Sequence, residues 1–409
     1  MTIYFVMKNL FPNGKASTAR VRCYTKGLTS YNIACKVILP IPLEKNNDPH
    51  FNTQVEGQFN GVYFKNMSGT LRRSKNIITR QFIDLKGYIN TLWYLIKTLQ
   101  KEDIVIVYEG GSFWHRIVAN VTHLKRCKVV MELNELPYGT SSQNNKTARK
   151  RERMLKKVFP KFDMFLTISE SLTRLAKQYS PHSAILKVPI LVEDVNINST
   201  TIIKEPYIFH SGTLTEQKDG ILGMIEAFGI ACKQLNKPLK YYMTGNLTDS
   251  PHAAEITQLI QKYHLEEKII FTGYLNNNEL ITYQKNCLFT IINKYDTLQN
   301  KYCFSTKLGE YLAFKKPVII TQIGEAMNYL QNNINAYIIP PHNINLLADK
   351  IIEIVNNPQK SQHIGNEGYK LTQTEFNCMT QAKKIINFLS YNNPVSYTHL
   401  RAHETCADL

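Results

Sequence analysis

A cation and a carboxylate that could act on an anionic ligand stand close together in Phe304–Thr321. The segment predicts a polar turn, a short helix that carries Lys307 and Glu310, a second turn and the apolar strand Pro317–Thr321. A carboxylate one turn into a helix, just before a buried strand, suits a ligand crevice at the end of a parallel sheet. We therefore take this segment as the first candidate site.

A glycine turn that could bind phosphate lies earlier, in Ser211–Gly220. It follows an expected strand and opens an expected helix, so we predict free backbone N–H groups and the positive end of a helix there. Gly212 would let the backbone approach a ligand closely, and Lys218 would supply a point charge for a phosphate. The alternative is an ordinary glycine turn with a solvent-exposed lysine.

Both candidates sit in a chain where buried strands alternate with helices. Before residue 190 the expected strands are Ile3–Met7, Ala34–Leu39, Ile104–Tyr108, Lys128–Leu133, Met164–Ile168 and Ala184–Val188. A second alternation starts at Tyr207 and runs to about Asn356. Continuous apolar strands separated by helices are typical of parallel, doubly wound sheets. We predict an α/β protein with two doubly wound, Rossmann-like domains that face each other across a crevice.

The domain limits follow from length, proline and charge. A chain of 409 residues is too long for one ordinary core. Prolines at 189 and 206 flank a segment without helical period, which we take as a linker over 191–206. The predicted domains are 1–190 and 207–378, with a helix over 379–390 that closes the second domain. The tail 391–409 lacks an apolar period and resembles translated adapter sequence, so we exclude it.

The positive charge is concentrated in the first half of the chain. Residues 1–195 hold 30 Lys and Arg against 14 Asp and Glu, whereas residues 196–409 hold 19 against 18. The asymmetry favours an anionic partner for the first half, either membrane lipid, lipid-linked phosphate or nucleic acid. A basic segment, 146–161, predicts an interfacial helix with an apolar stripe and membrane-facing cations, namely Arg149, Lys150, Arg153, Lys156 and Lys157. The alternative is an amphipathic helix with a basic solvent face.

Targeting and cysteine patterns favour the cytoplasm. No run of about 18 apolar residues is present, and the N-terminus lacks the pattern of a signal peptide. The eight cysteines are scattered without a Cys-x-x-Cys pair, which indicates reduced thiols and no metal site. We expect a cytoplasmic protein that can associate peripherally with the inner face of the membrane.

Order and spacing in the second half resemble the retaining glycosyltransferases of family 4, which have the GT-B fold. Gly212-Thr213-Leu214…Lys218 matches that family's diphosphate-binding turn, with Thr213 in place of an arginine. Glu310 matches the second of two glutamates eight residues apart, the one that holds the donor ribose, while Tyr302 replaces the first. The resemblance implies donor contacts from these residues and from the turn and helix around them: Gly212, Thr213, Lys218, Gly273, Tyr274, Ser305, Thr306, Lys307, Leu308 and Glu310.

The first half resembles the family mainly by the order of its elements. Asn134 and Glu135 stand where a histidine–aspartate pair is common, which implies polar contact with a sugar; an ordinary strand-end loop is the alternative. Asn13, Gly14 and Arg20 stand where the family's first loop and helix meet donor phosphate and acceptor. For Arg20 a solvated helix arginine is an equal alternative.

The resemblance implies a metal-independent transferase without a cofactor, which moves a sugar from a UDP- or GDP-linked donor to a lipid-linked glycan acceptor. Lys218 and Glu310 would act at the donor, and Asn134 and Glu135 at the sugar. The implied setting is capsule, exopolysaccharide or O-antigen assembly, with no nucleic-acid partner. Two alternatives stay open: a nucleotide-sugar epimerase on the same fold, and a non-enzymatic protein that binds membrane or nucleic acid.

Overall fold

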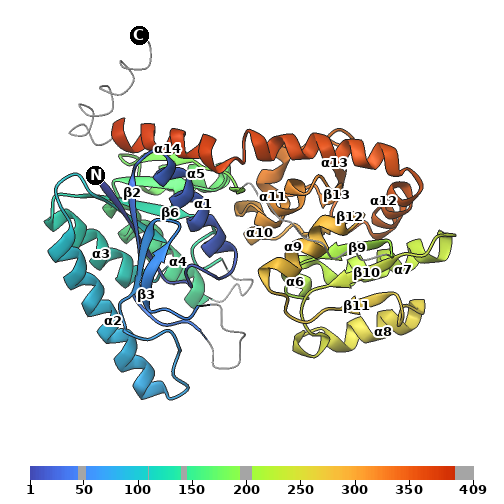
Figure 1. Ribbon diagram of the computed structural model, residues 1–409, viewed down its shortest axis with the longest axis horizontal. Helices are drawn as coiled ribbons and strands as arrows, with labels where there is room; N and C mark the ends of the chain where they lie inside the picture. Colours follow the sequence, from blue (N-terminus) through green and yellow to red (C-terminus); the bar gives the residue numbers. More distant parts are fainter. Residues whose placement is uncertain (45–51, 109, 140–144, 194–204, 392–409) are drawn as a thin grey trace, which may run out of the picture. The chain divides into compact units, whose positions relative to one another are not determined.

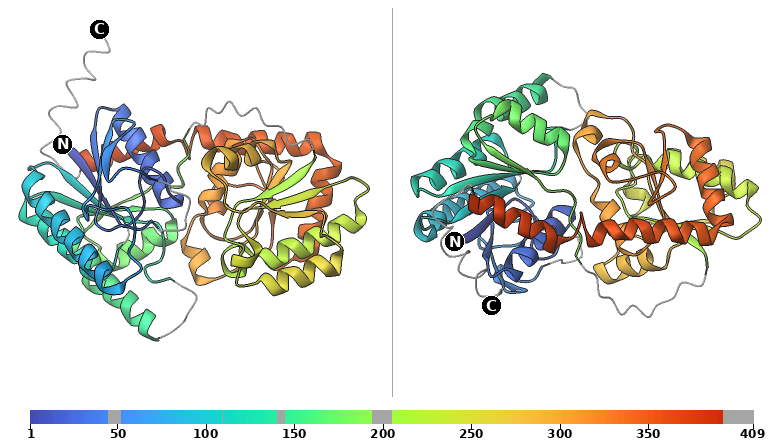
Figure 2. Two further views of the ribbon diagram at one scale, coloured as in Figure 1. Left: turned by 60° about the horizontal axis from the view of Figure 1, so that its bottom comes forward. Right: turned by 90° about the horizontal axis from the view of Figure 1, so that it is seen from above.

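The computed structural model describes residues 1–44, 52–108, 110–139, 145–193 and 205–391. These residues form two compact units (Figures 1 and 2). The first unit contains Met1–Leu191 together with the described residues from Cys378 onward, and the second contains Val192–Asn377. The predicted linker falls at this boundary, although most of it lies outside the described residues, as does the tail after residue 391.

The first unit is built on an eight-stranded sheet in the order β3-β4-β2-β1-β5-β6-β7-β8. All neighbouring strands are parallel except β3 and β4, which pair antiparallel. The strands are β1 Thr2–Met7, β2 Ala34–Leu39, β3 Glu56–Phe59, β4 Val62–Asn66, β5 Ile104–Tyr108, β6 Lys128–Leu133, β7 Met164–Thr167 and β8 Ala184–Lys187. The six strands predicted from their apolar runs are present, and the polar pair β3–β4 was not predicted.

Six α-helices belong to the described part of the first unit, and they join or cover its strands. They are α1 Ala16–Ser30, α2 Ile77–Thr98, α3 Ser112–Leu124, α4 Asn145–Lys157, α5 Glu170–Tyr179 and α14 Cys378–Tyr391, with the 3₁₀ turn η1 Phe159–Lys161 after α4. No helix within the described ranges is long and apolar enough to cross a membrane.

Helix α14 packs on the first unit, not on the second as we predicted. It lies beside α1 (Figure 1), and a Cβ on Gly27 of α1 would come within 2.7 Å of the Ala382 Cβ. Its apolar residues Ile385 and Leu389 join the core cluster that contains Ile3 and Leu28. The prediction failed because an amphipathic period shows that a face is buried but not which unit buries it.

The basic helix α4 differs from the interfacial helix that we predicted. Its apolar stripe is buried in the first unit: Met154 and Leu155 are 4% and 5% exposed, and Val158 and Phe159 are fully buried. The cations Arg149, Lys150, Arg153, Lys156 and Lys157 are exposed. Because no apolar side remains for lipid along this stripe, α4 is an amphipathic helix with a basic solvent face, which was our alternative interpretation.

The second unit has a six-stranded, all-parallel sheet in the order β11-β10-β9-β12-β13-β14. Its strands are β9 Tyr207–His210, β10 Lys240–Met243, β11 Ile269–Phe271, β12 Phe289–Ile292, β13 Val318–Thr321 and β14 Tyr337–Ile339. The helices around it are α6 Glu216–Asp219, α7 Ile221–Gln234, α8 Ala253–Tyr263, α9 Asn277–Asn286, α10 Leu298–Tyr302, α11 Thr306–Ala313, α12 Ile344–Asn356 and α13 Pro358–Gln373, with 3₁₀ turns η2 Leu247–Asp249 and η3 Gly324–Asn328.

The strand order of the second unit reverses at β9. From β9 the chain adds β10 and β11 on one side, then returns to add β12, β13 and β14 on the other. In open α/β sheets, ligands bind outside the carboxyl ends of the strands at such a switch point. The loops after β9 and β12 are therefore the place to look for a ligand site, and the turn that begins at Ser211 is one of them.

Candidate active site

The turn after β9 is held by neighbouring side chains. The backbone N–H groups of its first three residues donate to Tyr311 Oη (Ser211, 3.0 Å), Thr244 Oγ1 (Gly212, 2.9 Å) and Asp219 Oδ2 (Thr213, 2.9 Å). We predicted free N–H groups here, and for these three residues that prediction is wrong. Acceptors from α11, α6 and the end of β10 reach the turn and fix it.

Gly212 is the centre of a cluster of ionisable side chains. A Cβ at this position would lie 2.3 Å from His210 Nε2, 2.5 Å from Asp219 Oδ2 and 2.8 Å from Lys307 Nζ. Since real Cβ atoms do not approach so closely, the cluster needs a glycine here. We predicted that Gly212 lets a ligand approach the backbone. In the structure its missing Cβ leaves room for three side chains, one each from β9, α6 and α11.

An ion pair joins α6 to α11 within this cluster. Lys307 Nζ bonds to Asp219 Oδ1, and the exposed fractions of the two side chains are 23% and 6%. Burial alone would raise the pKa of Asp219, but His210 and the charge of Lys307 hold that pKa well below its ordinary value. Asp219 is therefore ionised at neutral pH. Burial lowers the pKa of Lys307, and the charge of Asp219 opposes that change.

The buried imidazole of His210 completes the cluster. Its Nε2 lies 3.8 Å from Asp219 Oδ2, and its side chain is 1% exposed. Burial and the neighbouring charge of Lys307 lower the pKa of His210, so the ring is neutral at neutral pH. His210 was missed in the sequence, although a histidine ending an otherwise apolar strand before a glycine turn was a usable signal.

The two candidate lysines occupy different environments. Lys307 stands at Gly212 in the ion pair, whereas Lys218 lies on the surface of the four-residue helix α6. The structure therefore brings Lys307, Gly212 and Thr213 together, and Thr213 Oγ1 also bonds to Asp219 at 3.1 Å. Lys218 follows the same turn but stays exposed.

Glu310 lies one turn after Lys307 on α11. Gln284 Nε2, from α9, donates to Glu310 Oε2 at 3.4 Å. Burial raises the pKa of Glu310, while Gln284 and the charge of Lys307 oppose that rise. The carboxylate predicted as the ligand-holding group is thus partly buried and has a polar partner.

Helix α11 presents its N-terminus at the same edge of the sheet. Ser305 is the N-cap residue but makes no side-chain cap, and Thr306 is the first helical residue. The first turn of an α-helix leaves N–H groups without an internal partner. Leu308 is fully buried and anchors the helix, so Ser305, Thr306 and Leu308 form one structural unit with Lys307 and Glu310.

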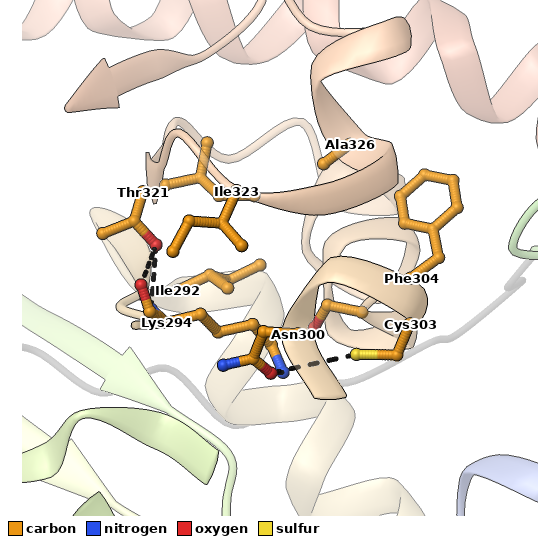
Figure 3. Close-up of a pocket in the computed structure, with 10 residues that line it drawn as sticks. Ile292, Lys294, Asn300, Cys303, Phe304, Thr321, Ile323 and Ala326 are labelled. Atoms are coloured by element: carbon orange, nitrogen blue, oxygen red, sulfur yellow. Dashed lines mark hydrogen bonds between the residues drawn. The ribbon is translucent and has the colours of Figure 1, made fainter. Parts of the chain in front are cut away.

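A small cavity lies beside that N-terminus (Figure 3). Its volume of about 10 Å³ is close to the minimum for one water molecule. Its polar lining residues are Lys294, Asn300, Cys303, Ser305 and Thr321, and Lys294 Nζ donates to Asn300 Oδ1 at 3.4 Å. The sequence did not single out Lys294 or Asn300, because the loop after β12 carries no glycine or proline motif.

Gly273 and Tyr274 stand at the end of β11. The Gly273 carbonyl accepts the N–H of Gly245 at 2.7 Å, and φ of Gly273 is +71°, a conformation that favours glycine. The Tyr274 ring is 67% exposed, and its hydroxyl lies 3.5 Å from Asp249 Oδ2. This turn lies at the same carboxyl edge of the sheet. It follows β11, which is farther from β12 in the strand order than β9 is.

The candidates of the first unit lie at the ends of β1 and β6. Asn134 Nδ2 donates to Tyr108 Oη at 2.7 Å, and Glu135 is exposed. The Asn13 N–H donates to Asn52 Oδ1 at 2.9 Å. At Gly14 a Cβ would come within 2.2 Å of Thr18 Oγ1, so this loop packs tightly onto α1.

Arg20 is neither a phosphate clamp nor a solvated helix arginine in this structure. It is 3% exposed, and its Nε bonds to Glu132 Oε1 at 2.6 Å. Its Nη1 and Nη2 donate to the carbonyls of Pro189 (2.6 Å) and Val188 (2.9 Å). The prediction missed Glu132, a carboxylate inside the otherwise apolar strand β6, whose burial requires a cation nearby.

Metal ligands are not gathered at this edge. Across the described ranges, no group of three or more His, Cys, Asp or Glu side chains is placed to hold a metal ion.

The two units together have a known fold. Two parallel-sheet, Rossmann-like domains in tandem are the GT-B glycosyltransferase fold, as predicted. Sucrose-phosphate synthase from Thermosynechococcus elongatus superposes with a TM-score of 0.71 at 14% identity, over 97% of this chain and all of that one. HepE from Anabaena, in complex with UDP-glucose, gives 0.69 at 14% identity over 96% of this chain and 100% of HepE.

The family comparison concerns the second unit. Residues 193–371 match the sequence model of glycosyl transferases group 1, and this range lies almost wholly in the unit that contains the Gly212 cluster. A curated relative, poly(ribitol-phosphate) alpha-N-acetylglucosaminyltransferase from Staphylococcus aureus, is 24% identical over 139 residues, which are 33% of this chain. The match spans 26% of that relative, about a quarter of its length.

A further solved structure belongs to an S. aureus protein, TarM, in complex with fondaparinux, alpha-GlcNAc-glycerol and UDP. It superposes with a TM-score of 0.67 at 14% identity, over 95% of this chain and 100% of that one.

Proposed function

We propose that the protein transfers a sugar from a nucleotide-sugar donor to a glycan acceptor, with retention of the anomeric configuration and without a metal. The observation that carries the proposal is the Lys307–Asp219 pair at Gly212, on the topological switch point of a domain that matches glycosyl transferases group 1. Ligands of such sheets bind at this edge.

The donor diphosphate would bind to Lys307 and to the N-terminal turn of α11. The Lys307 side chain is 23% exposed and its ammonium already faces an anion, Asp219, so a diphosphate oxygen would take one of its remaining N–H donors. The first-turn N–H groups of α11 and its positive end favour the same ligand. Lys218 adds charge from the surface.

The nucleoside would be held by a carboxylate and an aromatic ring. Glu310 would accept the ribose hydroxyls, since a carboxylate accepts two or more hydrogen bonds. Gly273 and Tyr274 would meet the base. UDP or GDP is the expected nucleotide, and the solved structures of HepE with UDP-glucose and of TarM with UDP support a nucleoside diphosphate on this fold.

Catalysis would consist mainly of stabilising the departing diphosphate. As the bond from the sugar C1 to the diphosphate oxygen breaks, an acceptor hydroxyl oxygen would bond to C1 and its proton would pass to the departing diphosphate. Negative charge develops on the departing oxygen, and Lys307 would be the preorganised cation that stabilises it. Asp219 keeps Lys307 in place and charged. Asn134 and Glu135 would contact the transferred sugar, and the neutral His210 gives rigidity to the turn.

The acceptor would be an anionic, lipid-linked glycan that binds to the basic first unit. Thirty cations against 14 acids in residues 1–195 favour a phosphate-bearing chain. The curated relative acts on poly(ribitol-phosphate), which is such a polyanion. Assembly of capsule, exopolysaccharide or O-antigen at the inner membrane face is the setting that we propose.

A panel of UDP-, GDP- and ADP-sugars tests the donor site. Thermal melting of the wild type should shift upward with one nucleotide class, and Lys307→Met should lose the shift while Lys218→Met keeps most of it. Transfer would then be followed with the responding donor, and NMR of the product would report the anomer. No shift with any donor, an isomerised donor without transfer, or an inverted product would each overturn the corresponding part of the proposal.

A further inference from the structure

Helix α2 carries an apolar stripe on its outward face. Six large side chains along it are 42–71% exposed: Ile78, Phe82, Leu85, Ile89, Trp93 and Ile96. They recur every three or four residues, so they lie on one side of the helix. Over the 19 residues from Ile78 to Ile96, the stripe is about 28 Å long. An exposed patch of this length on a folded unit indicates an interaction surface.

The opposite face of α2 packs against the first unit, and this packing keeps the apolar stripe on the outward side. A Cβ on Gly87 would come within 1.8 Å of the Pro40 carbonyl oxygen, so the helix backbone lies directly against that segment. Asn90 Nδ2 donates to the Met67 carbonyl at 2.8 Å, and Thr91 and Leu95 are fully buried. Because these contacts determine the rotation of α2, the stripe cannot turn inward.

The neighbouring helix α3 extends the surface. It packs beside α2 (Figure 1), and its Phe113 and Leu124 are 77% and 73% exposed. Arg116 and Arg126 are exposed on α3 and just after it. The next helix in contact, α4, adds the exposed cations described above. Exposed apolar side chains therefore lie on α2 and α3, and exposed cations lie on or beside α2, α3 and α4.

Acidic side chains are scarce on this surface. The exposed ionisable groups at and beside α2 are the cations Arg72, Lys75, Lys86, Lys97 and Lys101, and the acid within α2, Asp84, is partly buried near Arg73. On α4 the exposed acid Glu152 pairs with Lys156. Lys97 Nζ stands 3.9 Å from the centre of the Trp93 ring, which combines an aromatic body with a charged tip. Such a combination is typical of the boundary between lipid headgroups and acyl chains.

We propose that the outward face of α2 and α3 is a docking surface for an anionic lipid membrane, with α2 lying in the plane of the interface. The side chains Ile78, Phe82, Leu85, Ile89 and Trp93 would enter the acyl boundary, and the cations would meet lipid phosphates. This surface differs from the α4 stripe predicted from the sequence, which is buried. The proposal does not depend on the transferase activity.

Charge distinguishes the membrane from a second copy of this chain. In a two-fold dimer through α2, the same patch would face itself, and its lysines and arginines would repel those of the partner copy. An anionic bilayer offers the opposite charge together with an apolar layer. The observations therefore favour lipid as the occupant.

The test uses the full chain and vesicles of phosphatidylglycerol and phosphatidylcholine in equal amounts, with pure phosphatidylcholine as the comparison. Co-sedimentation should require the anionic lipid and weaken as salt is added. The triple change Ile78→Ser, Phe82→Ser and Ile89→Ser should lower vesicle affinity by at least about tenfold, because each replaced side chain loses its burial in lipid. Ile334→Ser, at a 53% exposed isoleucine of the second unit, is the matched control and should change nothing.

Trp93 provides a local reporter. The chain has two tryptophans, and Trp114 is 5% exposed, so Trp114→Phe leaves Trp93 as the sole emitter. Its fluorescence should shift to shorter wavelength with anionic vesicles and be quenched by brominated acyl chains. Unchanged binding of the triple variant, or an unchanged Trp93 spectrum on bound vesicles, would overturn the proposal. A dimer in lipid-free solution that the triple variant abolishes would overturn it in favour of a second copy.

Discussion

Each unit buries an ion pair near the carboxyl edge of its sheet, and the two pairs differ in how far the cation reaches solvent. In the first unit, Arg20 and Glu132 have side chains that are 2% and 0% exposed. In the second, Lys307 is 23% exposed beside a 6% exposed Asp219. The guanidinium of Arg20 donates hydrogen bonds to Glu132 and to two backbone carbonyls.

From this difference in exposure we infer that the Arg20–Glu132 pair stabilises the fold and that the Lys307–Asp219 pair serves the proposed reaction. Arg20 connects α1 to β6 and to the segment after β8, so its hydrogen bonds hold three parts of the first unit together. Lys307 joins α6 to α11 at a glycine turn, and its side chain is partly exposed. A buried pair contributes little net stability, yet removing one partner is costly. Both pairs should therefore respond to mutation, but in different properties.

The largest expected effect is that of Arg20→Met on stability. It leaves the Glu132 carboxylate buried without a cation, and we expect the free energy of unfolding of the first unit to fall by about 3–5 kcal/mol. Urea unfolding measures it. Adding Glu132→Leu should recover most of the loss, because the unpaired charge is gone. A cost below about 1 kcal/mol for the single variant would show that the pair is not architectural.

Lys307→Met should act mainly on the reaction. Loss of the preorganised cation should lower the rate of transfer by about 10²–10³-fold. Lys218→Met is the matched control, since this lysine is exposed and its removal should change the free energy of unfolding by no more than about 0.5 kcal/mol. Equal rate losses in steady-state assays of the two variants would remove the distinction that we draw between the lysines.

Gly212→Ala tests whether the Lys307–Asp219 pair requires a residue without a Cβ at position 212. Its Cβ would meet His210, Asp219 and Lys307, so we expect a loss of about 1–3 kcal/mol in unfolding free energy and weaker donor binding. Gly111→Ala, where the nearest atom to a Cβ is 3.7 Å away, is the control in the first unit. Calorimetry on both variants would compare them. Similar melting temperatures would mean that the Gly212 cluster is less tightly packed than described.

The smallest effect concerns Glu310→Gln and its dependence on pH. Because burial raises the pKa of Glu310, the folded carboxyl binds its proton more tightly than the unfolded one, and ionisation as the pH rises lowers stability. Glutamine removes this cost, so the melting temperature should rise at pH 7, by roughly 2–4 °C for each kcal/mol. Below about pH 4 the gain should vanish, since glutamate is then protonated in both states. Donor affinity should fall in the same variant, and a stability gain that persists at low pH would contradict the explanation.

The sequence predicted the sheet and its turns better than the side-chain partners. Apolar runs gave six strands of the first unit and the strands of the second, because parallel strands are buried on both faces. In β3 and β4 the more buried positions alternate with less buried ones, so neither strand is buried on both faces. Helix α13 begins at a proline that we did not interpret as a helix start.

The candidate site was predicted in part. Gly212, Lys307 and Glu310 were found from turns and spacing, but Asp219 and His210 were not. Their importance depends on the approach of Lys307 on α11, which lies 88 residues after Asp219 in the sequence. Arg20 and the α4 stripe were misjudged for the same reason. Their residue types fit two environments, and only the fold decides between them.

The position of α14 has a consequence for the order in which the chain can fold during synthesis. The second unit is continuous, Val192–Asn377, and lies inside the sequence of the first. A ribosome therefore releases all of the second unit before Cys378–Tyr391, the helix that packs on α1, has emerged. Until then α1 lacks its neighbour, and Leu28 and the apolar face around it stay uncovered. The unit made first is therefore completed last.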